Sequence, residues 1–426
     1  MLEPLGFPRI VSVQEINQKR SPLTMHARSF WAFLLAACWP GWCVAALDPT
    51  DVFQVYGTLS VVRDNNLFRE PDVDLTINGI DIGPKSDTVF IKGIGLKLDK
   101  TLSRQRLVTD INVNWSTYNK YDQLDYTGGD GRIAWLWQLG DYWNGEAAYR
   151  KRRTLGGFAD FVLKVKDIVD TDTYTLSAGY LFHPRWRVSA DLYKIDASHS
   201  AEIRRNLDYD AHAIGAELRY RTPAQNTVAL QARRTDRDYP NRIPTPTTDS
   251  GNREMRFNAV STWHPSGATR LDAQVGYVDV NFDTQDQDFS GNTWRAATIW
   301  DPTAKLRLSA NVFKDIRLYE DQSNSFVKVR GFGLSPIYSV TSKVSLQGDL
   351  IHERLNFESN REDKTRLARL GLTYAPIRNV DLSVSYEVGR RRSNSEVDVL
   401  VSGSIQTIKF NDYDYHTWFA TLRVGF

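Results

Sequence analysis

Cysteine is almost absent from this sequence. Its 426 residues include two, Cys38 and Cys43, and both lie in an N-terminal segment with the features of a signal peptide. A chain that loses both has no disulfide, no thiolate zinc site and no thiol nucleophile. The remainder of the chain must be stabilised without covalent cross-links.

Long apolar runs are equally scarce. The single run long enough to cross a membrane extends from Ser29 to Ala46. It follows Arg28 and ends in Val44-Ala45-Ala46, and a basic start, an apolar middle and a small-residue exit are typical of a secretory signal peptide. We expect cleavage after Ala46, so that residues 1–46 form an N-terminal extension and signal peptide. Translation from Met25 would give a signal of ordinary length.

Two alternatives for this run stay open. Leu35-Ala36-Ala37-Cys38 matches a lipoprotein cleavage box, which would leave a lipidated Cys38 at the mature N-terminus. An uncleaved anchor is the other alternative, although Pro40 and Gly41 interrupt a stretch that is barely long enough to span a bilayer. No second apolar run of this length follows, so the sequence predicts no inner-membrane helix.

The mature chain has no excess of either charge. Cleavage after Ala46 removes four of the 53 Lys and Arg residues and two of the 51 Asp and Glu residues, which leaves equal numbers of the two signs. Nucleic acid is therefore not an expected partner. No Ser-His-acid set, metalloprotease motif or phosphate loop occurs, so we expect no metal, no cofactor and no enzymatic activity.

The chain instead shows a regular alternation of apolar and polar residues. In residues 380–388 every even position is apolar and every odd position is polar, and the same pattern recurs in 305–312, 271–277, 186–192 and 111–115. Side chains of a strand point alternately to two faces, so each segment has one apolar and one polar face. A soluble sandwich would show this too. These segments run for about 10–15 residues, however, longer than is usual in soluble sheets and enough for a tilted strand to cross a bilayer.

Turns and loops alternate in length. Short connections fall near 101–104, 183–185, 222–225, 264–267, 301–304 and 376–379, and long polar ones near 64–86, 155–170, 238–251, 282–290 and 395–410. Short periplasmic turns and long external loops are typical of bacterial outer-membrane barrels. Prolines recur at the short turns, at Pro184, Pro223, Pro265, Pro302, Pro336 and Pro376. Four of them follow an aromatic residue by two positions (Phe182, Trp263, Trp300 and Tyr374), which we interpret as an interfacial girdle.

These patterns predict an all-β fold, a transmembrane antiparallel up-and-down β-barrel formed by residues 47–426. We expect about 18 strands, with 16 as the alternative, because an even number places both termini in the periplasm. The segment 64–86 is a long first loop and a candidate plug. The strands are expected at 51–62, 87–100, 104–117, 125–138, 141–154, 170–182, 185–197, 207–221, 225–237, 252–264, 268–281, 291–301, 304–318, 324–337, 342–356, 362–375, 379–394 and 411–426.

If the apolar faces contact lipid, the polar faces line the lumen. The charged residues expected there are Arg150, Arg152, Asp191, Asp272, Arg307, Asp349, Arg369, Asp381 and Glu387. Charges of both signs indicate water in a barrel of this size, although they could also pair across a closed lumen or hold a loop inside it. Basic groups near the expected outer strand ends are candidates for contact with lipopolysaccharide phosphates: Arg150 to Arg153, Arg233, Arg234, Arg237 and Arg390 to Arg392.

The last strand has a pattern of its own. Trp418, Ala420, Leu422, Val424 and Phe426 alternate with other residues up to a terminal aromatic. Such a strand is typical of the signal that the barrel-assembly machinery recognises. The expected partners are therefore outer-membrane lipid, lipopolysaccharide and this machinery, and the expected location is the outer membrane.

The opening of the mature chain resembles EpsL-type outer-membrane proteins of exopolysaccharide biosynthesis operons. The resemblance rests on Tyr56 to Arg69 (YGTLSVVRDNNLFR) and continues through 106–118 and 131–137. It implies a channel or accessory that moves exopolysaccharide across the outer membrane with periplasmic export proteins, and it supplies no catalytic residues. The DNNLFR stretch is shared with other barrel families. A passive porin for small solutes and a non-conducting surface scaffold or adhesion protein therefore stay as alternatives, with an outer-membrane hydrolase behind them.

Overall fold

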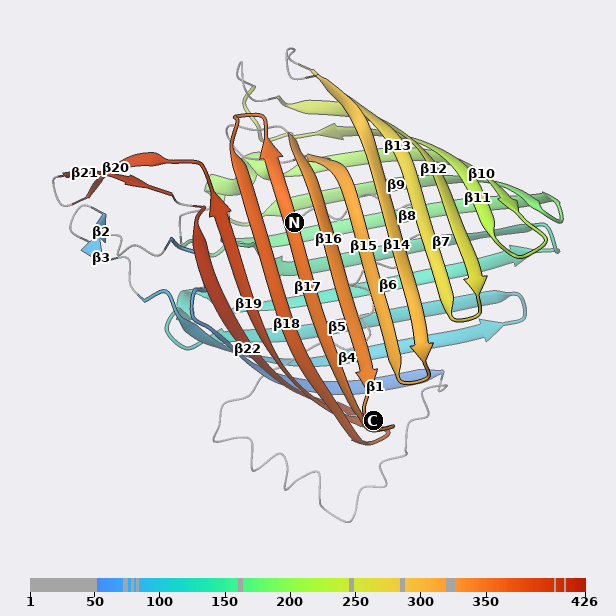
Figure 1. Cartoon of the computed structure of the whole chain (residues 1–426), viewed down its shortest axis with the longest axis horizontal. Helices are drawn as coiled ribbons and strands as arrows, with labels where there is room; N and C mark the ends of the chain where they lie inside the picture. Colours follow the sequence, from blue (N-terminus) through green and yellow to red (C-terminus); the bar gives the residue numbers. More distant parts are fainter. Residues whose placement is uncertain are drawn as a thin grey trace.

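The barrel closes on itself without an edge. In the computed structural model, which describes residues 52–71, 76–77, 80–81, 84–159, 164–244, 249–283, 288–318, 326–401, 404–409 and 411–426, eighteen strands form one antiparallel sheet. The first barrel strand pairs with both the last and the second, and the others follow around the ring in chain order (Figure 1). The predicted up-and-down barrel is confirmed. The predicted signal peptide lies outside the described residues and stays a prediction.

The barrel strands lie within two residues of their predicted bounds. They are β1 (Phe53–Asp64), β4 (Asp87–Leu102), β5 (Gln105–Tyr118), β6 (Tyr126–Leu139), β7 (Trp143–Leu155), β8 (Ile168–His183), β9 (Trp186–His199), β10 (Tyr209–Arg221), β11 (Thr227–Asp238), β12 (Gly251–Ser266), β13 (Thr269–Phe282), β14 (Phe289–Thr303), β15 (Leu306–Leu318), β16 (Phe326–Ser339), β17 (Val344–Phe357), β18 (Glu362–Ile377), β19 (Val380–Ser393) and β22 (Tyr413–Gly425).

Four short strands were not predicted and form a separate small sheet. They are β2 (Thr76–Ile77), β3 (Ile80–Asp81), β20 (Val397–Val401) and β21 (Ser404–Ile408), and Figure 1 shows β20 and β21 projecting beyond the barrel wall. Two 3-10 turns, η1 (Asp122–Leu124) and η2 (Glu202–Leu207), lie in loops. Within the described part of the chain, no helix is long and apolar enough to span a membrane.

The alternation seen in the sequence separates two faces of the wall. Along β19, Leu382, Val384 and Val388 are 39%, 48% and 44% exposed, whereas Glu387 on the other face is 6% exposed. Directly paired residues of neighbouring strands point to the same face, so the ladder carries this assignment around the whole ring. The exposed apolar face is the outer, lipid-facing surface, and the polar face points inward.

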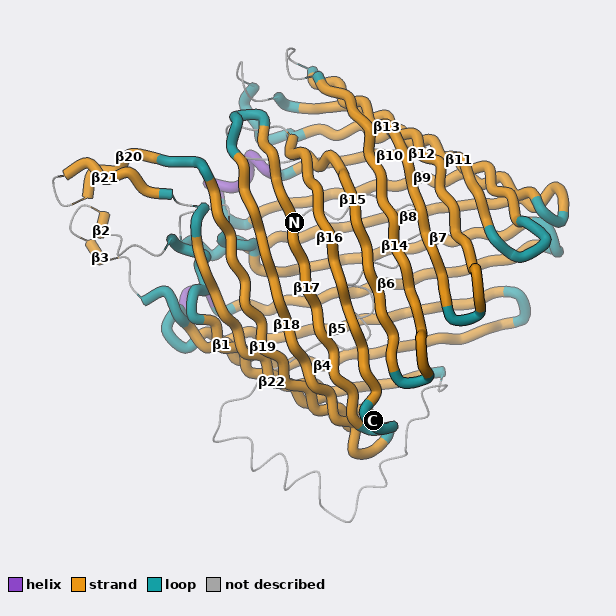
Figure 2. Tube along the Cα trace, in the orientation of Figure 1, coloured by secondary structure: helices purple, strands orange, loops and turns teal. Residues whose placement is uncertain are grey.

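The connections sort into two ends of the barrel. Turns such as 103–104, 184–185 and 267–268 lie at one end, here termed the short-turn end, together with the start of β1 and the end of β22. The long connections follow Asp64, Leu155 and Ser393, and these strand ends lie at the opposite end of the barrel, here termed the long-loop end. Figure 2 shows the two sets of connections at opposite ends of the strands. This is the alternation of short and long connections that the sequence predicts.

The prolines are placed differently from the prediction. Pro184 and Pro223 lie in turns, but Pro265, Pro302 and Pro376 lie near the ends of β12, β14 and β18. The register shifts around these three, because proline has no N–H for the ladder and an irregularity accommodates it. Pro336 likewise lies inside β16. The aromatics two positions earlier (Phe182, Trp263, Trp300 and Tyr374) are exposed on the outer face, as a girdle requires.

Candidate functional site: the inner wall and the barrel seam

Every predicted lumen-lining residue lies on the inward face of a barrel strand. They do not form one cluster, because they come from strands spread around the ring: Arg150 and Arg152 (β7), Asp191 (β9), Asp272 (β13), Arg307 (β15), Asp349 (β17), Arg369 (β18), Asp381 and Glu387 (β19). The inner surface is therefore a lining of distributed charges.

The partners of these charges lie beside them on the same wall. Arg150 Nη2 lies 2.8 Å from Asp130 Oδ2 of the neighbouring β6. Arg307 Nε donates to Asp301 Oδ1 of β14 (2.7 Å). Asp349 Oδ1 accepts from the Ser335 hydroxyl of β16 (2.6 Å). These contacts join neighbouring strands around the circumference of the barrel and do not extend toward its axis.

Three more of the predicted lumen-lining residues have polar or oppositely charged neighbours on the inner wall. Asp272 accepts from Thr262 Oγ1 (2.7 Å) and from Arg270 Nε (3.1 Å). Arg152 lies in register with the acidic Asp130, and Asp381 lies in register with the basic Arg423. The wall thus places opposite charges on adjacent strands, an arrangement that stabilises a sheet.

One ion pair passes over an intervening strand. Asp191, Gly215 and Arg233 lie in one cross-strand row on β9, β10 and β11, and Arg233 pairs with Asp191 over β10. A Cβ at Gly215 would overlap the Asp191 carboxylate, so a larger residue there would displace Asp191 from this position. Alternation in the sequence identifies Asp191 as inward, but the partner depends on register and was missed.

The inward charges are distributed unevenly around the ring. On β9, β10 and β11 the inward charged residues are Arg187, Arg219, Arg221, Arg233 and Arg237, against Asp191 and Glu217. On β17, β18 and β19 they are Asp349, Glu353, Asp363, Asp381 and Glu387, against Arg369 and Arg391. These two sets, here termed the positive wall and the negative wall, lie nearly opposite one another in the order of the strands. The two sets differ in sign within their own strands, and Glu353 and Asp363 of the negative wall also pair with Arg317 and Arg361, which lie outside those strands.

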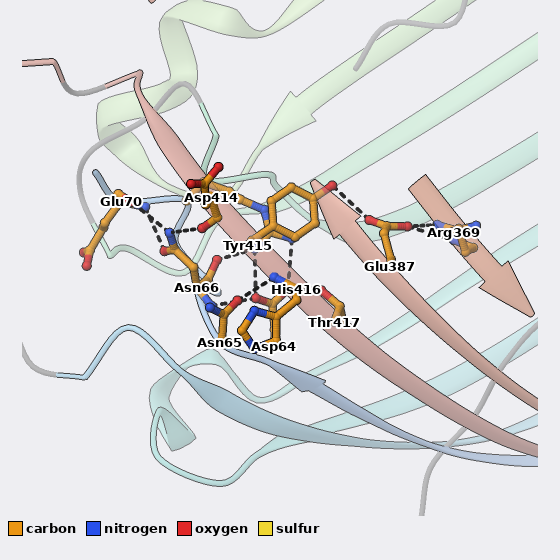
Figure 3. A network of polar contacts seen from close by, with 11 residues as sticks. Asp64, Asn65, Asn66, Glu70, Arg369, Glu387, Asp414, Tyr415, His416 and Thr417 are labelled. Carbon is orange, nitrogen blue, oxygen red and sulfur yellow. Dashed lines mark hydrogen bonds and ion pairs between the residues drawn. The ribbon is translucent and has the colours of Figure 1, made fainter. Parts of the chain in front are cut away.

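A second polar site lies where β1 meets β22 at the long-loop end (Figure 3). Arg69 Nη1 and Nη2 each donate to the Asp64 carboxylate (2.9 Å), and Thr417 Oγ1 donates to Asp64 Oδ2 (2.8 Å). The Arg69 guanidinium lies 3.6 Å from the centre of the Tyr415 ring. The Tyr415 hydroxyl donates to Glu387 Oε1 (2.9 Å), which links this site to the negative wall.

Two asparagines continue the β1–β22 ladder past the end of β1. Asn65 N donates to His416 O (3.2 Å), and Asn65 Oδ1 accepts from His416 N (2.6 Å). Asn66 Nδ2 donates to Asp414 O (3.0 Å) and to Glu70 O (2.8 Å). The stretch Asp64–Glu70, which includes the DNNLFR motif, is here termed the seam latch because it fastens the closing strands together.

The seam latch also packs into the mouth of the barrel. Phe68 is 4% exposed and packs with the inward residues Val89 and Tyr118. Lys164, from the connection between β7 and β8, has its Nζ 4.5 Å from the centre of the Phe68 ring and 3.0 Å from Glu70 Oε1. Described parts of two loops thus lie inside the long-loop end. Residues 72–75, 78–79 and 82–83 lie outside the described residues, so the plug predicted for 64–86 stays a prediction.

The basic groups predicted to face lipopolysaccharide are divided between the two faces. Alternation turns every second residue inward, and treating each group as one surface was wrong. Arg150, Arg152, Arg233, Arg237 and Arg391 point inward, whereas Lys151, Arg153, Arg234, Arg390 and Arg392 point outward.

The final strand occupies the position that closes the barrel. β22 pairs with β19 on one side and with β1 on the other. Trp418, Leu422 and Val424 lie on its outer face, and Phe426 N donates to Val55 O (2.7 Å). The role of these residues and Phe426 as an assembly signal stays a prediction.

Residues 73–402 match the family model described as "Putative beta-barrel porin 2". The chain belongs to this beta-barrel porin family. The match and the closed barrel place the protein in the outer membrane. They support a porin-like barrel and carry nothing specific to exopolysaccharide, which is supported by the sequence resemblance alone.

Comparison with solved structures finds porins at low sequence identity. A BenF-like porin from Pseudomonas fluorescens Pf-5 is 11% identical, with a TM-score of 0.48 over 88% of this chain and 99% of that chain. OccK2 (OpdF) from Pseudomonas aeruginosa, solved with glucuronate, is 9% identical, with a TM-score of 0.48 over 88% and 98%. OpdK from the same organism, solved with vanillate, is 11% identical, with a TM-score of 0.47 over 88% and 99%. No curated protein matches the chain.

Within the described part of the chain, acidic and histidine side chains do not converge into a metal site. Among the described residues, no group of three or more His, Cys, Asp or Glu side chains is placed to hold a metal ion. The charges of the inner wall are instead distributed in pairs, and the chemistry that this arrangement supports is electrostatic.

Proposed function

We propose that this barrel is a passive channel for small hydrophilic solutes. The observation that carries the proposal is that the inward charges pair along the wall, as in Arg150–Asp130, Arg307–Asp301 and Arg369–Glu387. Charges that closed a lumen would instead reach one another across it. Lateral pairs hold the side chains against the strands and leave the axis to water.

The number of strands supports the same proposal. Eighteen strands at a spacing of about 4.8 Å and a tilt of about 40° enclose a cylinder with a backbone diameter of about 36 Å. Inward side chains that extend about 7 Å from each wall would leave roughly 20 Å across. That width exceeds what wall side chains can fill, and barrels of 16 to 18 strands commonly leave an aqueous channel.

The two charged walls indicate the kind of solute. A solute in the lumen lies between the arginines of the positive wall and the carboxylates of the negative wall, and it experiences a transverse field. Charged, zwitterionic or strongly dipolar solutes replace lost hydration with contacts to these walls, whereas apolar solutes gain nothing. We therefore propose polar and charged small molecules as the solute class.

Movement of exopolysaccharide is the second candidate, and it rests on the resemblance of Tyr56 to Arg69 to EpsL-type proteins. Both candidates need an aqueous lumen, but they differ in the size of what passes. A non-conducting scaffold differs from both, because its lumen would be closed.

Solute flux into liposomes distinguishes the three. Purified barrel in liposomes should admit small sugars and amino acids, with rates that fall steeply as the solute grows. In planar bilayers it should conduct ions, and added polysaccharide should leave the current unchanged. A current blocked by polysaccharide at low concentration would favour the export candidate. A folded, inserted barrel without current or flux would contradict both channel proposals and support a scaffold.

A further inference from the structure

The outer face of β15 to β19 is strongly basic at the long-loop end. Its outward basic residues are Lys314, Lys328, Arg330, Arg354, Lys364, Arg366, Arg390 and Arg392, here termed the cationic arc. Among the outward residues of these five strands, all within the described part of the chain, Glu362 is the one acid. A surface with such an excess of basic residues favours the binding of an anion.

The cations of the arc stand directly opposite one another. Lys314 pairs in register with Arg330, Arg330 with Arg354, Arg354 with Lys364, and Lys364 with Arg392. Like charges at directly opposed positions destabilise a sheet. A row of this kind over five neighbouring strands therefore needs anions from outside the wall to offset its repulsion.

Among the described residues, one acid lies on the outer face beside the cations of β17 and β18. Lys364 Nζ lies 3.0 Å and Arg354 Nε 3.6 Å from the same carboxylate, Glu362. In the described part of the chain, Arg330 and Arg366 form no ion pair and no side-chain hydrogen bond. The middle of the arc therefore retains its positive charge.

At the edge of the cationic arc beside β22, the basic residues have an acidic partner. Arg390 and Arg392 share Asp414 (2.7 Å each). The unneutralised charge is therefore concentrated on the strands before β19.

On the opposite side of the barrel, the outward basic residues have acidic partners. On β7 to β12 the outward cations at the long-loop end are matched by acids on the same or neighbouring strands: Lys151–Asp172, Arg153–Asp170, Lys194–Asp196, Arg234–Asp236 and Arg253–Asp236. A solvated rim needs only such mixed charge. The excess in the cationic arc is thus a local feature and not a property of the whole rim.

The arc lies at the edge of the apolar band. On the same outer face, Val312 is two residues from Lys314, Phe332 is two residues from Arg330, and Val388 is two residues from Arg390. Two residues of a strand span about 7 Å. The cations therefore stand at the level of lipid headgroups, directly above the hydrocarbon region on the side of the long loops.

We propose that the cationic arc binds the phosphorylated sugar headgroup of an outer-leaflet glycolipid, lipopolysaccharide. Guanidinium groups bind phosphate in a bidentate manner, which suits the five arginines of the arc. A row across five strands extends about 19 Å at the usual strand spacing, which matches a sugar carrying several phosphates better than one phospholipid headgroup. The proposal rests on the outer-membrane location and is independent of whether the lumen conducts.

Native mass spectrometry of the detergent-purified barrel tests the proposal. The test variant is Arg330→Gln/Arg354→Gln/Arg366→Gln, and the matched control is Lys151→Gln/Arg153→Gln/Arg234→Gln from the other side. Each is incubated with rough lipopolysaccharide, with its dephosphorylated form and with phosphatidylglycerol. Wild type and control should retain lipopolysaccharide, and the test variant should retain less by at least about tenfold.

Three results would overturn the proposal. They are equal retention by the test variant, equal retention of dephosphorylated lipopolysaccharide, and binding of phosphatidylglycerol as tightly as lipopolysaccharide. The heat-modifiable gel shift reports whether each variant is folded. If the glutamine variant fails to fold, Arg330→Lys/Arg354→Lys/Arg366→Lys preserves the charge and should keep most of the binding. Loss of binding in that folded lysine variant would contradict an electrostatic origin.

Discussion

Arg69 joins the first long loop to the inner wall. It holds Asp64 with two hydrogen bonds and lies over the ring of Tyr415, and both partners belong to the strands that close the barrel. Arg63, the residue before Asp64, points outward, and within the described residues it has no ion-pair partner. The two arginines therefore separate the effect of the seam latch from the effect of removing a positive charge.

Arg69→Ala should loosen the seam latch. The substitution leaves the buried Asp64 carboxylate with fewer donors and removes a stacked cation, a loss of about 1–3 kcal/mol in local stability. We expect faster hydrogen exchange at the amides of residues 65–70, measured by mass spectrometry on the folded barrel. Arg63→Ala should leave those amides unchanged. Equal protection in both variants and the wild type would show that Arg69 does not hold the segment.

Alternation was enough to assign single residues to the inner or outer face, but not to pair them. Asp191 is identifiable as inward from its own strand. Its partner Arg233 is two strands away in a row that depends on register and on the missing side chain of Gly215. The DNNLFR motif was noted in the sequence only for its resemblance to other barrels, and its role at the seam was missed because its contacts to Tyr415 and Thr417 join residues about 350 positions apart.

Strands are the elements that the sequence predicts best, because each has to present an apolar face to lipid along its whole length. This requirement produces an alternation of apolar and polar residues within each strand, and it does not depend on which strand is its neighbour in the barrel. The bulges near Pro265, Pro302 and Pro376 were not anticipated, because they arise from pairing. The small sheet of β2, β3, β20 and β21 was also missed, because strands of two to five residues leave too little periodicity to detect.

The two faces of one strand should respond oppositely to charge. Leu308→Lys and Val384→Lys place an ammonium group against lipid, so the folded fraction should fall. The cost is about 2–4 kcal/mol at the midplane and decreases toward the interface, so the effect should be smaller at Leu308, which pairs with the girdle residue Trp300. Arg307→Glu and Asp381→Lys change inward side chains one residue from Leu308 and three from Val384. These variants should preserve the folded fraction, measured by the heat-modifiable gel shift in outer-membrane preparations. Similar losses at all four positions would contradict the assignment of faces.

The last strand should matter for insertion more than for conduction. Phe426 lies next to Val55 on the closing strand β1, and it ends the alternating outer face of β22. Phe426→Asp should lower the amount of folded barrel in the outer membrane, because the aromatic end of that face is lost. The molecules that do insert should conduct like the wild type. A normal yield of folded Phe426→Asp barrel would count against an assembly signal at this position.

Charge is balanced in the molecule as a whole but segregated within the barrel. Inside, a positive wall on β9 to β11 faces a negative wall on β17 to β19, and outside, the cationic arc covers β15 to β19 at one end only. The sequence could not reveal either pattern, since strands distant in the chain become opposite or adjacent only once the ring closes. The nearly equal numbers of basic and acidic residues in the sequence, 53 and 51, therefore conceal two electrically distinct surfaces.

Reversal potentials across planar bilayers under a salt gradient test the channel proposal most directly. The wild-type barrel should conduct, and the two walls should act on its ion selectivity in opposite senses. Arg219→Gln/Arg221→Gln, on the positive wall, should shift the reversal potential toward cation selectivity. Glu353→Gln/Asp381→Asn, on the negative wall, should shift it toward anion selectivity. A folded, inserted barrel that carries no current, or one whose reversal potential is the same in both variants, would contradict the account.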